Sequence, residues 1–119
     1  MQTQLSVQTG RKYSIPPASK RADKEFAKII KKRLKNHLKK IVLFGSYARG
    51  EFREDSDYDI LVIVDKKEKL IQDIILDACV EIMDNYYELI GCIVCDEKEW
   101  EIKQRFPIGL NILKEGIKL

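Results

Sequence analysis

Histidine, cysteine and long apolar runs are scarce in this sequence. It has 119 residues, with one histidine and three cysteines. No apolar run approaches the ~18 residues that a membrane-spanning helix needs, and the first residues lack the apolar segment of a secretory signal. An odd number of cysteines without such a signal predicts free thiols in a reducing compartment. We therefore expect a cytoplasmic protein with no membrane contact.

The same scarcity excludes several kinds of site. Cys92 and Cys95 fall three positions apart in an expected strand, so their thiols point to opposite faces and cannot share a metal ion. We interpret both as small buried apolar residues, and Cys79 likewise. His37, the only histidine, borders the apolar stripe of an expected helix. Zinc binding and catalysis by Ser-His-Asp or Cys-His groups are not expected.

The length predicts one domain over residues 20–119, preceded by an extended lead-in at residues 1–19 that carries two adjacent prolines. The net charge of +3 is uneven, because residues 20–40 hold ten basic and two acidic side chains. A patch of this kind is typical either of a solvated lysine-rich helix face or of a surface that binds nucleic acid. We favour the first, since no row of aromatic side chains alternates with the basic ones.

Periodicity predicts a helix, two strands, a helix, a strand and two short helices. The first helix begins near Ala22, with Ser19 as its N-cap, and its apolar stripe runs from Phe26 to Leu38. The strands are expected at 41–44, 57–64 and 88–95, and the other helices at 67–86, from Asp96 onward and at 108–114. Asp96 and Glu99 are expected to form a capping box, and Gly116 to end the last helix. The fold class is α/β (α+β), a small mixed sheet of three or four strands flanked by helices.

Two carboxylates and a Gly-Ser turn carry the chemistry. Asp57 and Asp59 alternate at the start of the second strand, so both project from one face. Their repulsion is relieved by a hard cation, and Mg²⁺ prefers one or two carboxylates together with water and phosphate oxygens. Gly45 and Ser46 end the first strand and open a turn whose N–H groups favour an anion. Arg49 adds a charge-assisted contact to phosphate.

The stretch GSYARGEFREDSDYDILVIVD resembles the signature of the minimal nucleotidyltransferase branch of the DNA polymerase β-like superfamily. The resemblance spans about residues 24–115 and implies the polymerase β-like fold. It also implies Mg²⁺-dependent transfer of a nucleoside monophosphate, AMP from ATP, to a hydroxyl acceptor, with two metal ions. Asp57 and Asp59 would then ligate metal, while Gly45, Ser46 and Arg49 would bind the nucleotide.

Many members of this family place a third carboxylate on the next strand. That strand here is ELIGCIVC, with Glu88 as its only acid and Asp96 just beyond its end. We assign Glu88 as the third catalytic residue, against the alternative that it is a surface residue at the strand's edge.

Proteins of this branch resemble the antitoxins of toxin–antitoxin pairs, whose partner is a HEPN-domain protein. The resemblance therefore implies an antitoxin that modifies a HEPN-type toxin. The alternative is a weak or inactive enzyme that neutralises its partner by binding alone. A small-molecule acceptor is less expected, because no second domain is available to select it. Nucleic acid is not an expected partner, and a homodimer stays open.

Overall fold

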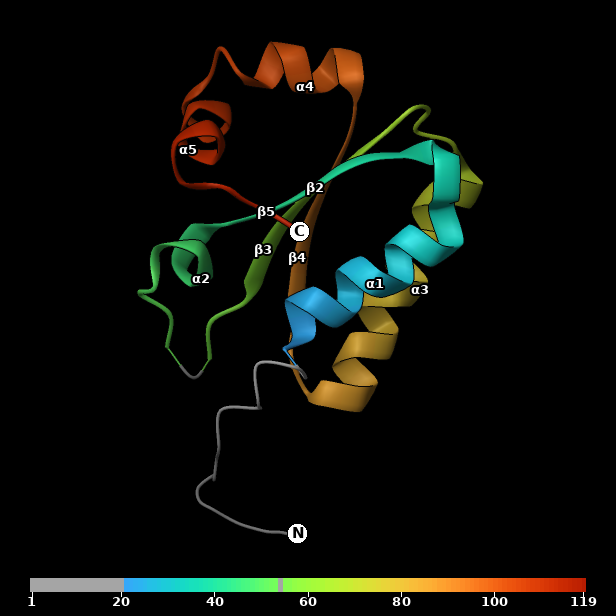
Figure 1. The fold of residues 1–119 in the computed structure, drawn as a ribbon, viewed down its shortest axis with the longest axis vertical. Coiled ribbons are helices and arrows are strands. Elements are labelled where there is room, and N and C mark those ends of the chain that lie inside the picture. Colours follow the sequence, from blue (N-terminus) through green and yellow to red (C-terminus); the bar gives the residue numbers. More distant parts are fainter. Residues whose placement is uncertain (1–20, 54) are drawn as a thin grey trace, which may run out of the picture.

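A four-stranded sheet with helices on both faces forms the protein (Figure 1). The computed structural model describes residues 21–53 and 55–119, so the predicted lead-in and the N-cap at Ser19 lie outside the described residues. In chain order the elements are α1 (Ala22–Leu34), the 3-10 turn η2 (Lys35–His37), β2 (Leu38–Phe44), α2 (Gly45–Arg49), β3 (Tyr58–Val64), α3 (Lys69–Tyr86), β4 (Ile90–Asp96), α4 (Glu97–Lys103), α5 (Pro107–Glu115) and β5 (Ile117–Lys118).

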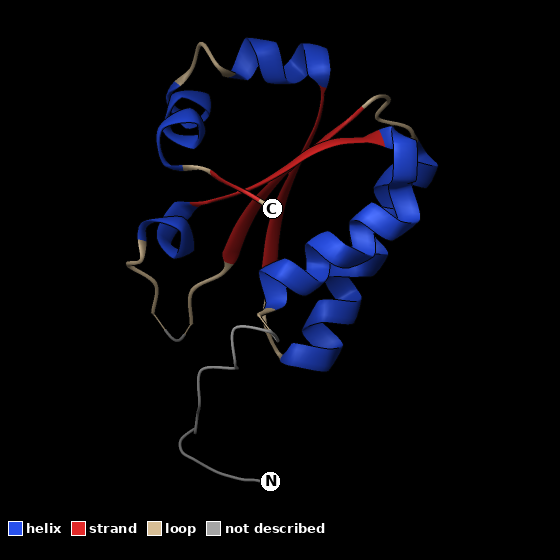
Figure 2. Cartoon of the chain, viewed as in Figure 1, coloured by secondary structure: helices blue, strands red, loops and turns tan. Residues whose placement is uncertain are grey.

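The sheet is mixed, with the strand order β4-β3-β2-β5. Strand β2 pairs antiparallel with β3 and with β5, whereas β3 and β4 are parallel. Because parallel neighbours need a crossover, α3 connects β3 to β4 across one face of the sheet (Figure 2). The predicted fold class is confirmed. Within the described part of the chain, no helix combines the length and apolar character needed to cross a membrane.

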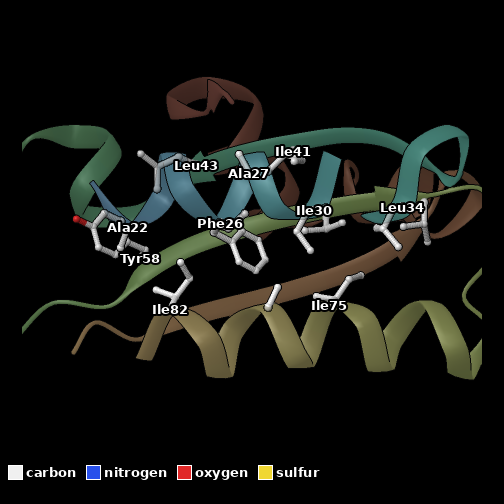
Figure 3. Close-up of a cluster of buried hydrophobic side chains, with 14 of the residues drawn as sticks. Ala22, Phe26, Ala27, Ile30, Leu34, Ile41, Leu43, Tyr58, Ile75 and Ile82 are labelled. Carbon is white, nitrogen blue, oxygen red and sulfur yellow. The ribbon is translucent and has the colours of Figure 1, made fainter. Parts of the chain in front are cut away.

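The two faces of β3 are buried against different helices. Tyr58, Ile60, Val62 and Val64 face α1 and α3, where Phe26 is fully buried at the centre of the larger core (Figure 3). The alternate residues of β3 face the other side. There Leu61 and Ile63 pack with Val42, Cys95 and Ile112, the last of which comes from α5. Asp59 has the same parity as Leu61, so it belongs to the α5 face.

The boundary between α1 and β2 differs from the prediction. The helix ends at Leu34, because Lys35 has a positive φ of 50°, and β2 begins three residues before the expected position 41. Leu38 follows the helical spacing of the α1 apolar residues, but it belongs to β2. It packs from that strand against the same core as α1. His37 therefore does not border a helix stripe. It is exposed, and its Nδ1 lies 3.0 Å from a carboxylate oxygen of Asp65.

Four smaller features can be compared with the sequence predictions. Leu70 and Met83 were expected in the buried stripe of α3 but are 71% and 44% exposed, at its margins. The capping box between Asp96 and Glu99 is present. Cys92 and Cys95 do point to opposite faces, because each packs in a different core. The short strand β5 was not predicted; it supplies the fourth strand of the sheet.

Candidate active site

Asp59 occupies a narrow space between two glycines at one end of the sheet. In the strand register it pairs with Phe44 on β2 and with Gly91 on β4. Gly45, the residue after Phe44, has a φ of +78°. A Cβ atom built on Gly45 would lie 2.1 Å from Oδ2 of Asp59, and one built on Gly91 would lie 3.3 Å from Oδ1. The fold therefore brings the Gly-Ser turn directly against the second carboxylate of the Asp-x-Asp pair.

Asp57 lies two residues earlier, in the exposed segment just before β3, while Asp59 is half-buried. Burial and the nearby negative charge of Asp57 raise the pKa of Asp59 above its ordinary value, and the positive charge of Arg49 opposes that shift. The two carboxylates are thus close enough to repel each other. This is the electrostatic situation that a bound cation relieves.

An aromatic stack holds Tyr58, the residue between Asp57 and Asp59. The ring of Tyr58 stacks on that of Tyr47 from α2, with ring centroids 3.8 Å apart, and Tyr47 stacks in turn on Phe52 at 4.4 Å. Tyr58 is 4% exposed and packs in the larger core (Figure 3). Its neighbour Asp59 has the opposite parity along β3 and so belongs to the other face. The stack therefore joins α2, which carries Gly45 and Ser46, to the start of β3 without occupying the face of the acids.

Arg49, at the end of α2, is held by two carboxylates. Its Nε donates to Oε1 of Glu51 and its Nη1 donates to Oε2 of Glu115, both at 2.8 Å. Glu115 is the last residue of α5, and its negative charge also acts on the pKa of Asp59. Arg49 and Glu115 thus lie within electrostatic range of the acidic pair.

Glu88 and Asp96 are the two candidates for a third acid. The negative charge of Glu88 acts on the pKa values of Tyr47 and Tyr58, whose rings belong to the face opposite Asp59. Asp96 pairs with the last residue of β3 and caps α4. It is five positions along β4 from Gly91, which corresponds to roughly 16 Å. The position of β4 that faces Asp59 is occupied by glycine.

The carboxylates of Asp57 and Asp59 fit a Mg²⁺ ion that takes its other ligands from water and substrate. No cluster of three or more His, Cys, Asp or Glu side chains that could hold a metal ion occurs within residues 21–53 and 55–119. Two carboxylates with mutual repulsion are a suitable protein contribution for Mg²⁺, which takes its other ligands from water and from the phosphates of a nucleotide. Asp57 and Asp59 are the residues that would hold it.

Sequence reasoning missed Gly91 and Glu115. Gly91 has no signal in a single sequence, because its role depends on the register between β3 and β4. Glu115 is 66 residues from Arg49 and sits beside a predicted helix stop, where an acid has no obvious function. The pairing of β5 with β2 returns this end of the chain toward the Gly-Ser turn.

Comparison with known proteins assigns the chain to a family independently of the site geometry. The family model described as "Nucleotidyltransferase domain" matches residues 23–117. The chain is 38% identical over 96 residues to the candidate protein adenylyltransferase MJ0604 of Methanocaldococcus jannaschii, covering 81% of this chain and 92% of that protein. A second candidate protein adenylyltransferase of that organism, MJ1305, is 33% identical over 96 residues, covering 75% of this chain and 63% of the relative.

Solved structures support the same fold. The protein superposes with a TM-score of 0.53 on a chain of a toxin–antitoxin complex crystallised with AMP-PNP, at 18% identity, covering 81% of this chain and 70% of the other. A chain described as a candidate nucleotidyltransferase gives a TM-score of 0.50 at 23% identity, covering 81% and 95%. The family model and the relative MJ0604 establish that the chain belongs to the nucleotidyltransferase domain family, in agreement with the signature at Gly45, Ser46, Asp57 and Asp59.

Proposed function

We propose that the protein transfers AMP from ATP, with Mg²⁺, to a hydroxyl group on a partner protein, and that the partner is a HEPN-type toxin that this modification neutralises. The observation that carries the proposal is the contact between the Gly45 turn and the Asp59 carboxylate, where a Cβ would come within 2.1 Å. An anion-binding turn and a cation-binding acid side by side are the two halves of a site for a metal–nucleotide complex.

Each residue has a defined task under this proposal. The turn at Gly45 and Ser46 binds the triphosphate through backbone N–H groups and a hydroxyl, and no other described residue hydrogen-bonds that hydroxyl. Arg49 contributes charge-assisted bonds to phosphate. Asp57 and Asp59 would hold Mg²⁺, which would supply neutralisation of phosphate charge and polarisation of the α-phosphate.

The reaction is an in-line displacement. The acceptor oxygen forms a bond to the α-phosphorus, the bond between that phosphorus and the bridging oxygen breaks, and pyrophosphate leaves. The acceptor hydroxyl proton passes to a base, for which Glu88 stays our predicted candidate. Positioning and electrostatic stabilisation carry most of such a reaction.

The names of the relatives favour protein as the acceptor class, since both are candidate protein adenylyltransferases. The HEPN partner is inferred from the resemblance of the sequence to antitoxins of this branch. The decisive experiment incubates the protein with ATP labelled at the α-phosphate, Mg²⁺ and the protein encoded beside it. We expect the label on that protein. In Asp57→Asn/Asp59→Asn, we expect complex formation without labelling. Labelling by this double variant would refute the site assignment.

One observation favours the alternative of a binding-only antitoxin. The residue of β4 that faces Asp59 is Gly91, so no acid from that strand reaches the pair. Under this alternative the wild-type protein binds MgATP and its partner, neutralises the partner, and transfers no label. The same labelling experiment separates the two functions, provided that MgATP binding is measured in parallel.

A further inference from the structure

The ion pair between Arg49 and Glu115 joins two elements that are far apart in the chain. Glu51, the other partner of Arg49, is a near neighbour in sequence with a side chain that is 68% exposed. The side chain of Glu115 is 17% exposed and comes from the end of α5. The less exposed partner is less screened by water, so it restrains the guanidinium more strongly.

Glu115 has a rigid support. The next residue, Gly116, packs so tightly that a Cβ there would lie 2.6 Å from Cγ1 of Val42 on β2 and 2.5 Å from the carbonyl oxygen of Ile112. The chain then continues as β5, paired with β2. The carboxylate is therefore fixed relative to the strand that ends in the Gly-Ser turn, as a residue that positions another must be.

The guanidinium of Arg49 keeps donors that its two acidic partners do not use. An arginine has five N–H protons in a fixed plane. Glu51 takes the proton on Nε and Glu115 takes one on Nη1 of Arg49. Among the described residues, nothing accepts from Nη2. The side chain can thus stay held by both acids while it binds a phosphate oxygen through its remaining protons.

We propose that Glu115 is a positioning residue of the nucleotide site, which orients Arg49 toward the triphosphate and makes the end of α5 part of that site. The inference rests on the proposed function only in taking MgATP as the ligand. Because Glu115 acts through Arg49, the losses of MgATP affinity from replacing Glu115 and from replacing Arg49 should not add.

The test measures binding of MgATP to the full chain by calorimetry. Glu115→Gln should weaken binding roughly tenfold, the usual scale for losing a residue that supports a ligand-binding group. The matched control is Glu101→Gln, an exposed position on α4, which should bind as wild type does. In an Arg49→Gln background, Glu115→Gln should add little, because the group that it positions is already gone. In the labelling reaction, Glu115→Gln should raise KM for ATP more than it lowers kcat.

Two results would overturn the inference: wild-type affinity in Glu115→Gln, or an equal loss with and without Arg49, which would mean that Glu115 acts by another route. If Glu115→Gln does not fold, Glu115→Asp takes its place. That variant keeps the charge but shortens the reach, and should show a smaller loss that also disappears in Arg49→Gln. Failure of the proposed function is distinguishable, since binding without transfer leaves this test intact, whereas a wild-type chain that does not bind MgATP refutes both.

Discussion

At the scale of single residues, we expect the candidate site to depend on the absence of a side chain at Gly45. Its φ of +78° lies in the left-handed region, and a Cβ would come within 3.0 Å of Cγ and 2.1 Å of Oδ2 of Asp59. Gly50 provides a natural comparison, because its φ is +74° but a Cβ there would have nothing within 4 Å. The two glycines thus share one conformational requirement and differ in contact with the acid.

We predict that Gly45→Ala and Gly50→Ala each lose about 1–2 kcal/mol of stability from placing a Cβ in left-handed backbone, and that Gly45→Ala loses more in total because its Cβ also clashes with Asp59. Only Gly45→Ala should also lose MgATP binding, because its methyl group displaces the Asp59 carboxylate. Urea unfolding measures the free energy of unfolding, and calorimetry measures the MgATP affinity. Equal nucleotide affinity in both variants would mean that the close approach of Gly45 to Asp59 has no role in binding.

At the scale of elements, an ion pair connects the two helices that cover one face of the sheet. Arg33 on α1 donates to Glu81 on α3, and both side chains are 40% exposed. The hydrogen bond from Arg33 lowers the pKa of Glu81 below its ordinary value of 4.5. Because the folded state favours the ionised carboxylate, the pair stabilises the protein above that pH and loses its contribution as pH falls through the lowered pKa.

We predict that Glu81→Gln lowers the free energy of unfolding at neutral pH and that the difference from wild type closes as the pH falls below 4.5. The difference should also shrink in about 1 M salt, because the pair is exposed to solvent. Urea titrations across this pH range are the measurement, with Glu97→Gln as an exposed control. A difference that persists unchanged at acid pH would show that the effect is not the charge of Glu81.

At the scale of the whole molecule, the end of the chain completes the sheet. Strand β5 pairs Ile117 with Leu43 and Lys118 with Val42. The backbone N–H of Leu119 donates to the carbonyl of Ile41 at 2.9 Å, and Lys31 on α1 donates to the carbonyl of Leu119 at 2.8 Å. These bonds cover the edge of β2, which would otherwise offer unpaired backbone groups.

We predict that removing residues 117–119 lowers stability by about 2 kcal/mol, at roughly 1 kcal/mol for each lost backbone hydrogen bond. The truncated chain should also bind MgATP more weakly, because the support for Glu115 is gone. Urea unfolding and calorimetry test both parts. Lys118→Ala keeps the backbone and should change neither. A truncated chain with unaltered stability and affinity would contradict a role for β5 in either.

Much of this architecture is readable from local sequence. The apolar runs around Leu43 and Leu61 define buried strands, and the period of α3 indicates its buried stripe except at the margins, where Leu70 and Met83 are exposed. The capping box at Asp96 is a local hydrogen-bond pattern. The boundary near Leu38 is less accessible, because an apolar residue at helical spacing packs equally well from a strand. Helix and strand periodicities coincide over such a short interval, so the core selects between them.

The sequence alone indicated the family and the candidate site residues, because Gly45-Ser46 and Asp57-x-Asp59 are local patterns. The tertiary structure decided which other groups join them. It puts Gly91 opposite Asp59 and brings Glu115 to Arg49. Both depend on strand register and on the return of the chain through β5, which join residues distant in sequence and leave no periodic trace in it.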